Sequence, residues 1–364
     1  MEKLKQTENI SEQFFLKIEK LINLWERFKE TDEGKEALNE ALVEFLNSEK
    51  SDAELLRILG ARIRDERKGT KIKLVGTVEI SNVCRVNCLY CSMRRDNLSK
   101  DKIQRISKHD LVASIKNALL SGCTEVFVQS GEDPQIVDVL IEALNELKEE
   151  LGGVKIVTNL GDLDSKQYLK LKNAGVTQYV SNFETSNIPM HERLREHSFS
   201  KRVSAMKGAQ AVGMDLGSGF IIGFDGQTNQ DIANDLCFVN KMNVRNMTSV
   251  TCFTPSEETP LAHEKVGDVE KTLNVIALLR ILYPDFDIPI PPNSNSEKLN
   301  YNSPLSGMTL AYQAGANTVY ENFTPESVKS GYGIYNIANK RPVVTKGSID
   351  RLIEETDRNL LVNN

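Results

Sequence analysis

Short apolar runs alternate with amphipathic stretches through most of this chain, and the alternation is the main guide to its fold. The runs that we expect to be strands span residues 72–80, 124–129, 154–159, 177–182, 215–222, 247–253, 286–290 and 317–322. Between them, apolar positions recur at helical spacing, for example in residues 110–122, 136–153, 199–213 and 268–282. Strands that alternate with helices in this way are typical of a parallel sheet. The expected fold class is therefore α/β, a TIM-type (β/α)8 barrel.

Helical patterning also precedes and follows the predicted barrel. Between residues 10 and 67 apolar side chains such as Leu21 recur at helical spacing, and Ser51 with Glu54 forms a capping-box signature. A last amphipathic helix is expected over residues 347–361. No linker rich in Pro, Gly or Ser divides the chain. We therefore predict a helical N-terminal extension (1–70), one barrel (71–325) and a C-terminal tail with one helix (326–364).

The composition narrows the classes of partner. Of the 364 residues, 40% are hydrophobic and 26% are charged, as in an ordinary soluble globular protein. The net charge of −6 gives no general electrostatic reason to bind nucleic acid or an anionic membrane. The first residues are polar and no long apolar run occurs, so neither a signal core nor a membrane span is expected. We expect a cytoplasmic protein with no nucleic-acid or membrane partner.

The most specific chemical signal is a group of three cysteines. Cys84, Cys88 and Cys91 have the spacing C-x3-C-x2-C directly after the first predicted strand. Three thiolates suit a metal centre that keeps one coordination position open for an exchangeable ligand. A structural zinc site would need a fourth ligand, and the next candidate along the chain is His109. A disulfide would leave one thiol over, in a chain that is expected in a reducing compartment.

Polar side chains also follow several other predicted strands. Glu132 follows the second, Asn159 ends the third and Glu184 follows the fourth, while Arg202 lies early in the helix after it. Because the carboxyl ends of barrel strands share one face, we expect these side chains to meet at the barrel mouth. Carboxylates there can bind an amine or a ribose diol, and a guanidinium can bind a carboxylate. Taken singly, Glu132 would belong to an ordinary helix start before Asp133 and Pro134, and Arg202 would be a solvated cation.

The remaining candidates have plainer interpretations. Glycines in residues 217–223 lack the G-x-G-x-x-G spacing of a nucleotide site, and we expect them to let a ligand approach the barrel wall closely. The other cysteines stand singly in apolar surroundings typical of small buried side chains, namely Cys123, Cys237 and Cys252. The histidines lie in charged surroundings that favour surface positions, namely His109, His191, His197 and His263.

The segment 79-EISNVCRVNCLYCSMRRDN-97 resembles the cluster loop of radical S-adenosylmethionine (SAM) enzymes. With VQSGEDP, HERLREHSF, GFIIGFDGQT and TPLAHEKVGD, the resemblance extends over about residues 54–325. It points to the biotin synthase-like branch, and within it to the HydE family of [FeFe]-hydrogenase maturases. The resemblance implies that the three cysteines hold an oxygen-sensitive [4Fe–4S] cluster whose open iron binds SAM. It further implies SAM or pocket contacts from Tyr90, Glu132, Asn159, Glu184 and Arg202.

The same resemblance sets the functional expectation. We expect a radical SAM enzyme that makes a 5′-deoxyadenosyl radical and acts on a small molecule, with a low-potential electron donor of the flavodoxin or ferredoxin type. The HydE pattern has Arg-His where this chain has Asn182-Phe183, and no cysteine follows Cys252 to hold an auxiliary cluster. A HydE-like substrate in metallocofactor assembly leads the hypotheses. The alternatives are an amino-acid mutase like methylornithine synthase (PylB) and a non-catalytic iron–sulfur carrier.

Overall fold

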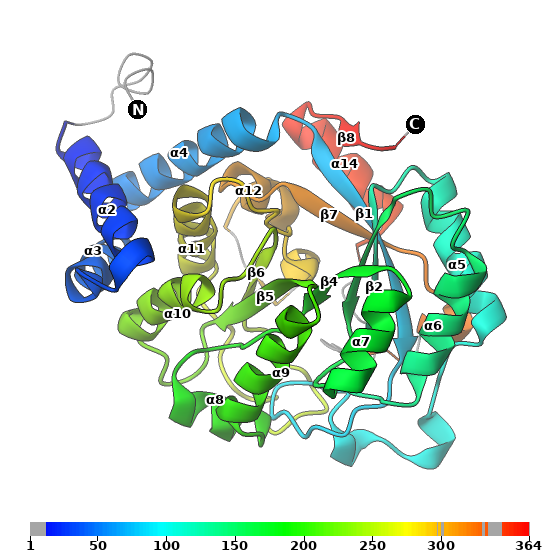
Figure 1. The fold of residues 1–364 in the computed structure, drawn as a ribbon. Coiled ribbons are helices and arrows are strands. Elements are labelled where there is room, and N and C mark those ends of the chain that lie inside the picture. Colours follow the sequence, from blue (N-terminus) through cyan, green and yellow to red (C-terminus); the bar gives the residue numbers. More distant parts are fainter. Residues whose placement is uncertain (1–11, 297, 300–301, 330–331, 334–343, 364) are drawn as a thin grey trace.

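A parallel sheet forms the centre of the molecule. The computed structural model describes residues 12–296, 298–299, 302–329, 332–333 and 344–363. The strands follow the order β6-β5-β4-β3-β2-β1-β7, and a short β8 pairs with β1. Their bounds are β1 (Ile72–Ser81), β2 (Glu125–Ser130), β3 (Lys155–Asn159), β4 (Val176–Val180), β5 (Asp215–Ile222), β6 (Thr248–Cys252), β7 (Thr318–Asn322) and β8 (Leu360–Leu361). The sheet is curled, with helices around its outer side (Figure 1), so the predicted α/β barrel class is confirmed.

The helices that surround the sheet fall between its strands. They are α5 (Lys108–Leu120), α6 (Ile136–Glu146), α7 (Ser165–Asn173), α8 (Ile188–Arg195), α9 (Phe199–Ala211), α10 (Asn229–Lys241), α11 (Val269–Leu282) and α12 (Gly307–Gln313). Single turns of 3-10 helix occur at Arg95–Asn97, Lys100–Lys102 and Pro292–Asn295. After β7 come α13 (Glu326–Lys329) and α14 (Lys346–Thr356). The last helix is shorter than predicted, because Asp357 adopts a left-handed backbone (φ 51°) and the chain then turns into β8.

Among the residues that the structure describes, three helices precede the barrel: α2 (Glu12–Thr31), α3 (Lys35–Leu46) and α4 (Lys50–Lys68). The helical character predicted for this region is therefore found. They lie along one flank of the molecule in Figure 1. A Cβ atom on Gly60 of α4 would lie 2.5 Å from the Ala314 carbonyl oxygen, so only glycine permits this close packing. The predicted capping box is wrong, since α4 starts at Lys50 and leaves Ser51 inside its first turn. The division into regions 1–70, 71–325 and 326–364 stays a prediction.

One predicted strand, 286–290, does not form. This segment makes only isolated bridges, from Asp287 to Met247 on one side and from Pro289 to Thr318 on the other. Pro289 has no N–H to donate, and the Ile288 N–H donates to the side chain of Asn317 at 2.8 Å instead of to a strand. A regular ladder is therefore interrupted. The extended segment still lies between β6 and β7 and closes the barrel there.

Arg280 of α11 holds this closing segment in place. The residue is fully buried, and its guanidinium donates to the carbonyl oxygens of Gly315 (3.0 Å), Pro284 (2.8 Å) and Phe286 (2.7 Å). It also donates to Asn317 Oδ1 at 2.8 Å. The Arg280 side chain thus gives hydrogen bonds to backbone carbonyl oxygens that a regular β-strand ladder would otherwise pair.

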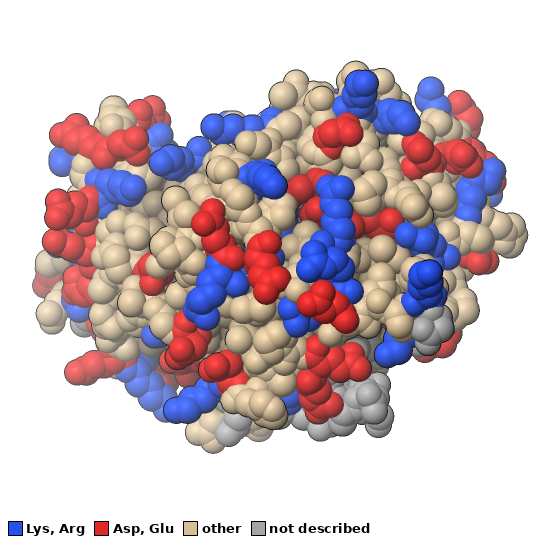
Figure 2. Space-filling model, turned by 90° about the horizontal axis from the view of Figure 1, so that it is seen from below, with Lys and Arg blue, Asp and Glu red and all other residues tan. Residues whose placement is uncertain are grey.

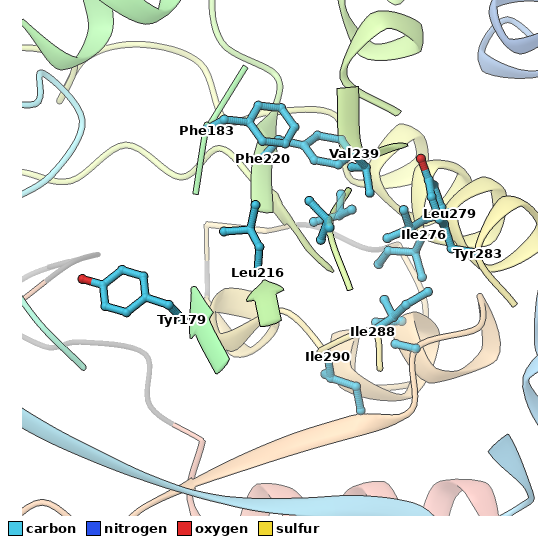
Figure 3. Packing of buried hydrophobic residues seen from close by; sticks show 14 of the residues in the cluster. Tyr179, Phe183, Leu216, Phe220, Val239, Ile276, Leu279, Tyr283, Ile288 and Ile290 are labelled. Atoms are coloured by element: carbon cyan, nitrogen blue, oxygen red, sulfur yellow. The ribbon is translucent and has the colours of Figure 1, made fainter. Parts of the chain in front are cut away.

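Successive side chains of β5 point alternately to the outer core under the helices and to the inside of the barrel. Phe220 and Leu216 point outward into the core under the helices, where Phe220 stacks on Phe183 with ring centroids 5.5 Å apart (Figure 3). The residues between them, Gly217 and Gly219, therefore occupy the inward positions. Inside the barrel an apolar layer is formed by Val75, Phe127, Val157, Val180, Met247 and Tyr320.

The surface carries charges of both signs. Acidic and basic side chains intermingle over the face in Figure 2, with no large area of one sign. Within the described residues, none of the helices combines the length and apolar character needed to cross a membrane.

Candidate functional site

The predicted site residues line one cavity of about 270 Å³ inside the barrel. Its walls come from the carboxyl-terminal parts of the strands and from the loops that follow them. All eight candidates face this cavity, namely Cys84, Cys88, Cys91, Tyr90, Glu132, Asn159, Glu184 and Arg202. The expectation that side chains distant in sequence meet at one barrel mouth therefore holds for the whole set.

The three cysteines lie on the long loop between β1 and α5. The loop is tied to α8, because the Leu89 N–H donates to the Leu194 carbonyl oxygen at 2.8 Å. Burial raises the pKa of the Cys84 and Cys91 thiols. Among the described residues, no group of three His, Cys, Asp or Glu side chains is placed to hold a single metal ion. A four-iron cluster takes each thiolate on a different iron and does not require that convergence.

Glycines let the cysteine loop and its neighbours approach closely. A Cβ atom on Gly131 would lie 2.2 Å from the Val83 carbonyl oxygen and 2.9 Å from Cys84 Cβ. Gly161 has a left-handed φ of 82°, and a Cβ there would lie 2.3 Å from Glu132 Cγ. The loops after β1, β2 and β3 thus pack backbone against backbone around Glu132, a contact that side chains at either glycine would prevent.

Glu132 is held from two sides. Its Oε1 accepts from Arg85 Nε at 2.6 Å, and its Oε2 accepts from the Asp162 N–H at 2.8 Å. Burial opposes ionisation, but these hydrogen bonds and the nearby Arg202 charge lower the pKa of Glu132 below its usual value. The side chain is therefore an ionised carboxylate whose oxygens each keep a further acceptor site.

Glu184 occupies a strained backbone position in the loop that follows β4. Its φ is 64°, a left-handed conformation that non-glycine residues seldom adopt. The carboxylate lies 3.5 Å from Arg195 Nη1 and accepts a hydrogen bond from Tyr90. Burial raises its pKa, while the Arg195 and Arg202 charges act in the opposite direction. Strain of this kind commonly marks functional sites.

Arg202 and Arg195 are buried cations with donor capacity left over. Arg202 Nη1 donates to Ser181 Oγ and lies 2.8 Å from Asp162 Oδ1, an ion pair without a well-aligned hydrogen bond. The Nε atoms of Arg202 and Arg195 are both buried without a partner. Two guanidiniums that face one cavity with unused donors suit an anionic group such as a carboxylate.

Three contributors to the site were missed from the sequence. Arg195 lines the cavity, and Arg85 and Asp162 fix Glu132 and Arg202. Arg195 lies within HERLREHSF, a segment that carries the family resemblance, so a signal for it was available. Arg85 and Asp162 contribute through their contacts with Glu132 and Arg202, and no sequence motif marks either residue.

Two expectations about individual residues were wrong. His191 is fully buried, with Nδ1 2.7 Å from the Phe183 carbonyl oxygen, and burial lowers its pKa to about 3. His197 is partly buried, while His109 and His263 are exposed as predicted.

The inward glycines of β5 do not leave room for a ligand. A Cβ on Gly219 would lie 2.0 Å from Ser249 Oγ, so neighbouring side chains fill that space.

Asp235 of α10 anchors the loop that carries Glu184. The fully buried carboxylate accepts from the Ser186 N–H (2.5 Å) and Oγ (2.6 Å), and its Oδ2 has no partner. Burial raises the pKa of Asp235 to about 7. The native state therefore keeps a proton that the unfolded chain releases at an ordinary carboxyl pKa near 4.

The free energy of unfolding should consequently fall as the pH rises from about 4 to 7, by up to about 1.4 kcal/mol per pH unit from this group. Asp235→Asn mimics the protonated form and should flatten that slope in urea unfolding curves. Asp138→Asn, at a side chain that is 70% exposed, is the matched control and should keep the wild-type slope. An unchanged slope in Asp235→Asn would contradict the assignment.

The comparisons with known proteins agree with this geometry. Residues 78–239 match the Radical SAM superfamily. The chain is 34% identical to the [FeFe] hydrogenase maturase subunit HydE of Thermotoga maritima, over 83% of this chain and 85% of that protein. It is 32% identical to biotin synthase of Bacillus velezensis, over 71% of this chain and 77% of that protein.

Solved structures share the fold. Methylornithine synthase (PylB) superposes with a TM-score of 0.73 at 24% identity, covering 89% of this chain and 94% of that one. HydG, a maturase of the [FeFe]-hydrogenase, gives a TM-score of 0.72 at 18% identity, covering 95% and 78%. Both likenesses concern the fold alone. The family match and the sequence relatives show the family: this chain belongs to the radical SAM superfamily of enzymes.

Proposed function

We propose that this enzyme reductively cleaves SAM at a [4Fe–4S] cluster held by Cys84, Cys88 and Cys91, and directs the 5′-deoxyadenosyl radical at a small molecule in the barrel. Family membership implies an iron–sulfur cluster and the use of SAM. The observation that carries the proposal is that the three thiols and the five predicted contact residues line the same cavity. When bound, the cluster would supply the electron and an open iron for SAM.

The protein's part is to bind, orient and shield. Arg195 and Arg202 offer unused donors to the SAM carboxylate, and the ionised Glu132 offers acceptor sites to its amino group. Asn159, Glu184 and Tyr90 are the further contacts that we assign to SAM. Apolar residues pack around the cysteine loop and would keep water away, namely Val86, Met190, Leu194, Ile221, Phe224 and Phe253. A dry site strengthens each of these polar contacts.

The relatives guide the finer proposal. The similarity to HydE supports a small-molecule substrate in metallocofactor assembly, with a low-potential donor of the flavodoxin or ferredoxin type and a reducing, cytoplasmic setting. PylB-like mutase chemistry is the second candidate, and its support is the likeness in fold. A non-catalytic carrier is the third. It would not need Glu184 in a strained conformation or Arg195 and Arg202 buried at the cavity.

One anaerobic experiment tests the proposal. The cluster is reconstituted and reduced with dithionite, SAM is added, and 5′-deoxyadenosine is quantified. Wild type should form 5′-deoxyadenosine, and Cys88→Ala should form none above background because the cluster loses a ligand. Cys123→Ala removes a buried thiol that does not line the cavity and should behave as wild type. Equal product from wild type and Cys88→Ala would refute the proposal, and cluster transfer without product would favour the carrier.

A further inference from the structure

Arg195 is a buried cation next to the cysteine loop. It is the last residue of α8, and Leu194 before it packs in the same apolar cluster as Cys88 and Tyr90. The Leu194 carbonyl oxygen accepts from the Leu89 N–H at 2.8 Å, which ties the end of α8 to the loop between two of the cysteines. The Arg195 side chain is only 8% exposed and lines the cavity that the three thiols also line. A full positive charge is therefore held beside the thiols.

The electrostatic surroundings of Arg195 also connect it to the thiols. Burial lowers the pKa of the Arg195 guanidinium, but the charges of Cys88, Tyr90 and Glu184 more than offset burial and raise this pKa above its ordinary value. Glu184 lies 3.5 Å from Arg195 Nη1 and accepts a hydrogen bond from Tyr90. Arg195 Nε is buried without a partner. The cation therefore interacts with negative charge on the cysteine loop as well as with Glu184.

The medium between Arg195 and the thiols is apolar. The three cysteines pack in or against a cluster that contains Phe224 and Phe253. Coulomb interactions are stronger in such surroundings than in water, because the local dielectric constant is lower. Arg193 of the same helix carries the same charge on an exposed side chain, where water and salt screen it. Two arginines of α8 thus differ mainly in how strongly their charges act on the thiol site.

We infer that Arg195 raises the reduction potential of the cluster that Cys84, Cys88 and Cys91 hold. Reduction moves one electron from the external low-potential donor to the cluster, which gains one negative charge while the donor is oxidised by one electron. A fixed cation nearby stabilises the more negative, reduced state more than the oxidised state. The inference rests on the proposed function, because it takes the [4Fe–4S] cluster as given.

A redox titration tests the inference on anaerobically reconstituted enzyme without SAM, so that contacts with SAM do not enter. Electron paramagnetic resonance of the reduced cluster gives the midpoint potential. Arg195→Gln should lower the equilibrium constant for one-electron reduction about tenfold, a shift of about 59 mV to more negative potential. The titration is run at pH 8.5, about four units above the ordinary pKa of a glutamate, so that Glu184 stays ionised.

Two variants separate the charge of Arg195 from its packing. Arg195→Lys keeps the charge and should keep most of the wild-type potential. Arg193→Gln removes the same charge from an exposed position of α8 and should leave the potential unchanged. An unchanged or higher potential in Arg195→Gln overturns the inference. So does an equal shift in either of the other two variants.

Glu184→Gln repeats the test with the opposite sign if Arg195→Gln holds no cluster. Loss of the carboxylate that faces Arg195 leaves the cation unopposed, so the potential should rise, and an unchanged or lower potential would contradict the inference. The same preparations are assayed for 5′-deoxyadenosine. Enzyme that cleaves SAM with a potential independent of Arg195 refutes the inference alone. Enzyme whose potential depends on Arg195 but that does not cleave SAM refutes the proposed function alone, and wild type that loads no cluster refutes both.

Discussion

Replacing Gly131 by alanine is expected to remove most of the cluster content and SAM-cleaving activity while leaving the barrel folded. The added methyl group would lie 2.2 Å from the Val83 carbonyl oxygen, and backbone atoms cannot turn aside as a flexible side chain can. The cysteine loop would have to move away from Glu132, at a local cost of about 1–3 kcal/mol. Loss of such supporting contacts typically costs 10–100-fold in metal affinity, and we expect a loss of about that size.

Iron and sulfide content per chain, with 5′-deoxyadenosine formed per cluster, measures the Gly131→Ala effect. Gly347→Ala is the matched control, because its Cβ would meet no atom nearer than 3.9 Å and its backbone is ordinary. Full cluster loading in Gly131→Ala would show that the loop tolerates displacement, and the assigned contact between the two loops would then be unimportant. Circular dichroism confirms that both variants keep the fold.

Arg280→Met should be among the most destabilising single substitutions in the barrel, by about 3–5 kcal/mol. It leaves the carbonyl oxygens of Gly315, Pro284 and Phe286 buried without a donor. Each such group costs about 1–3 kcal/mol. Relief from burying the guanidinium, whose pKa burial lowers to about 10, offsets part of that loss.

The midpoint of urea unfolding measures the effect of Arg280→Met. Arg67→Met provides the comparison, because Arg67 binds Asp285 in the same turn but both side chains are more than half exposed. Exposed pairs contribute about 0–1 kcal/mol, so this midpoint should hardly change. Equal effects from the two substitutions would mean that the closing segment is held by packing and not by the guanidinium.

The barrel and the set of cavity residues could be predicted because both follow from local signals. Cys84, Glu132 and Glu184 stand directly after apolar runs, and parallel topology then brings the strand ends together. The segment 286–290 failed because an apolar run reads as a strand even where Pro289 breaks the ladder. Arg280 donates hydrogen bonds to backbone carbonyl oxygens around this interruption. Those partners could not be predicted, because no sequence motif identifies a backbone carbonyl as an acceptor.

The misplaced side chains share a different cause. His191 has polar sequence neighbours, yet it is fully buried, and its ring packs against Phe199 with ring centroids 4.9 Å apart. Gly217 and Gly219 looked like space for a ligand, but Ser249 and Asn182 lean over Gly219 from both sides. Both errors concern tertiary neighbours that are distant in sequence, which periodicity does not report.

The pairing of β8 with β1 has a consequence for how the chain acquires its structure. Ile72 and Lys73 pair with Leu360 and Leu361, and Lys73 also pairs with Thr318 of β7. Contacts between such distant residues raise the contact order and slow the final closure. During synthesis the backbone groups of β1 that pair with β7 and β8 stay unpaired until those strands have been made. Unpaired strand edges of this kind promote aggregation. Truncation before residue 360, or a bulky fusion there, should therefore lower the yield of folded enzyme more than its stability.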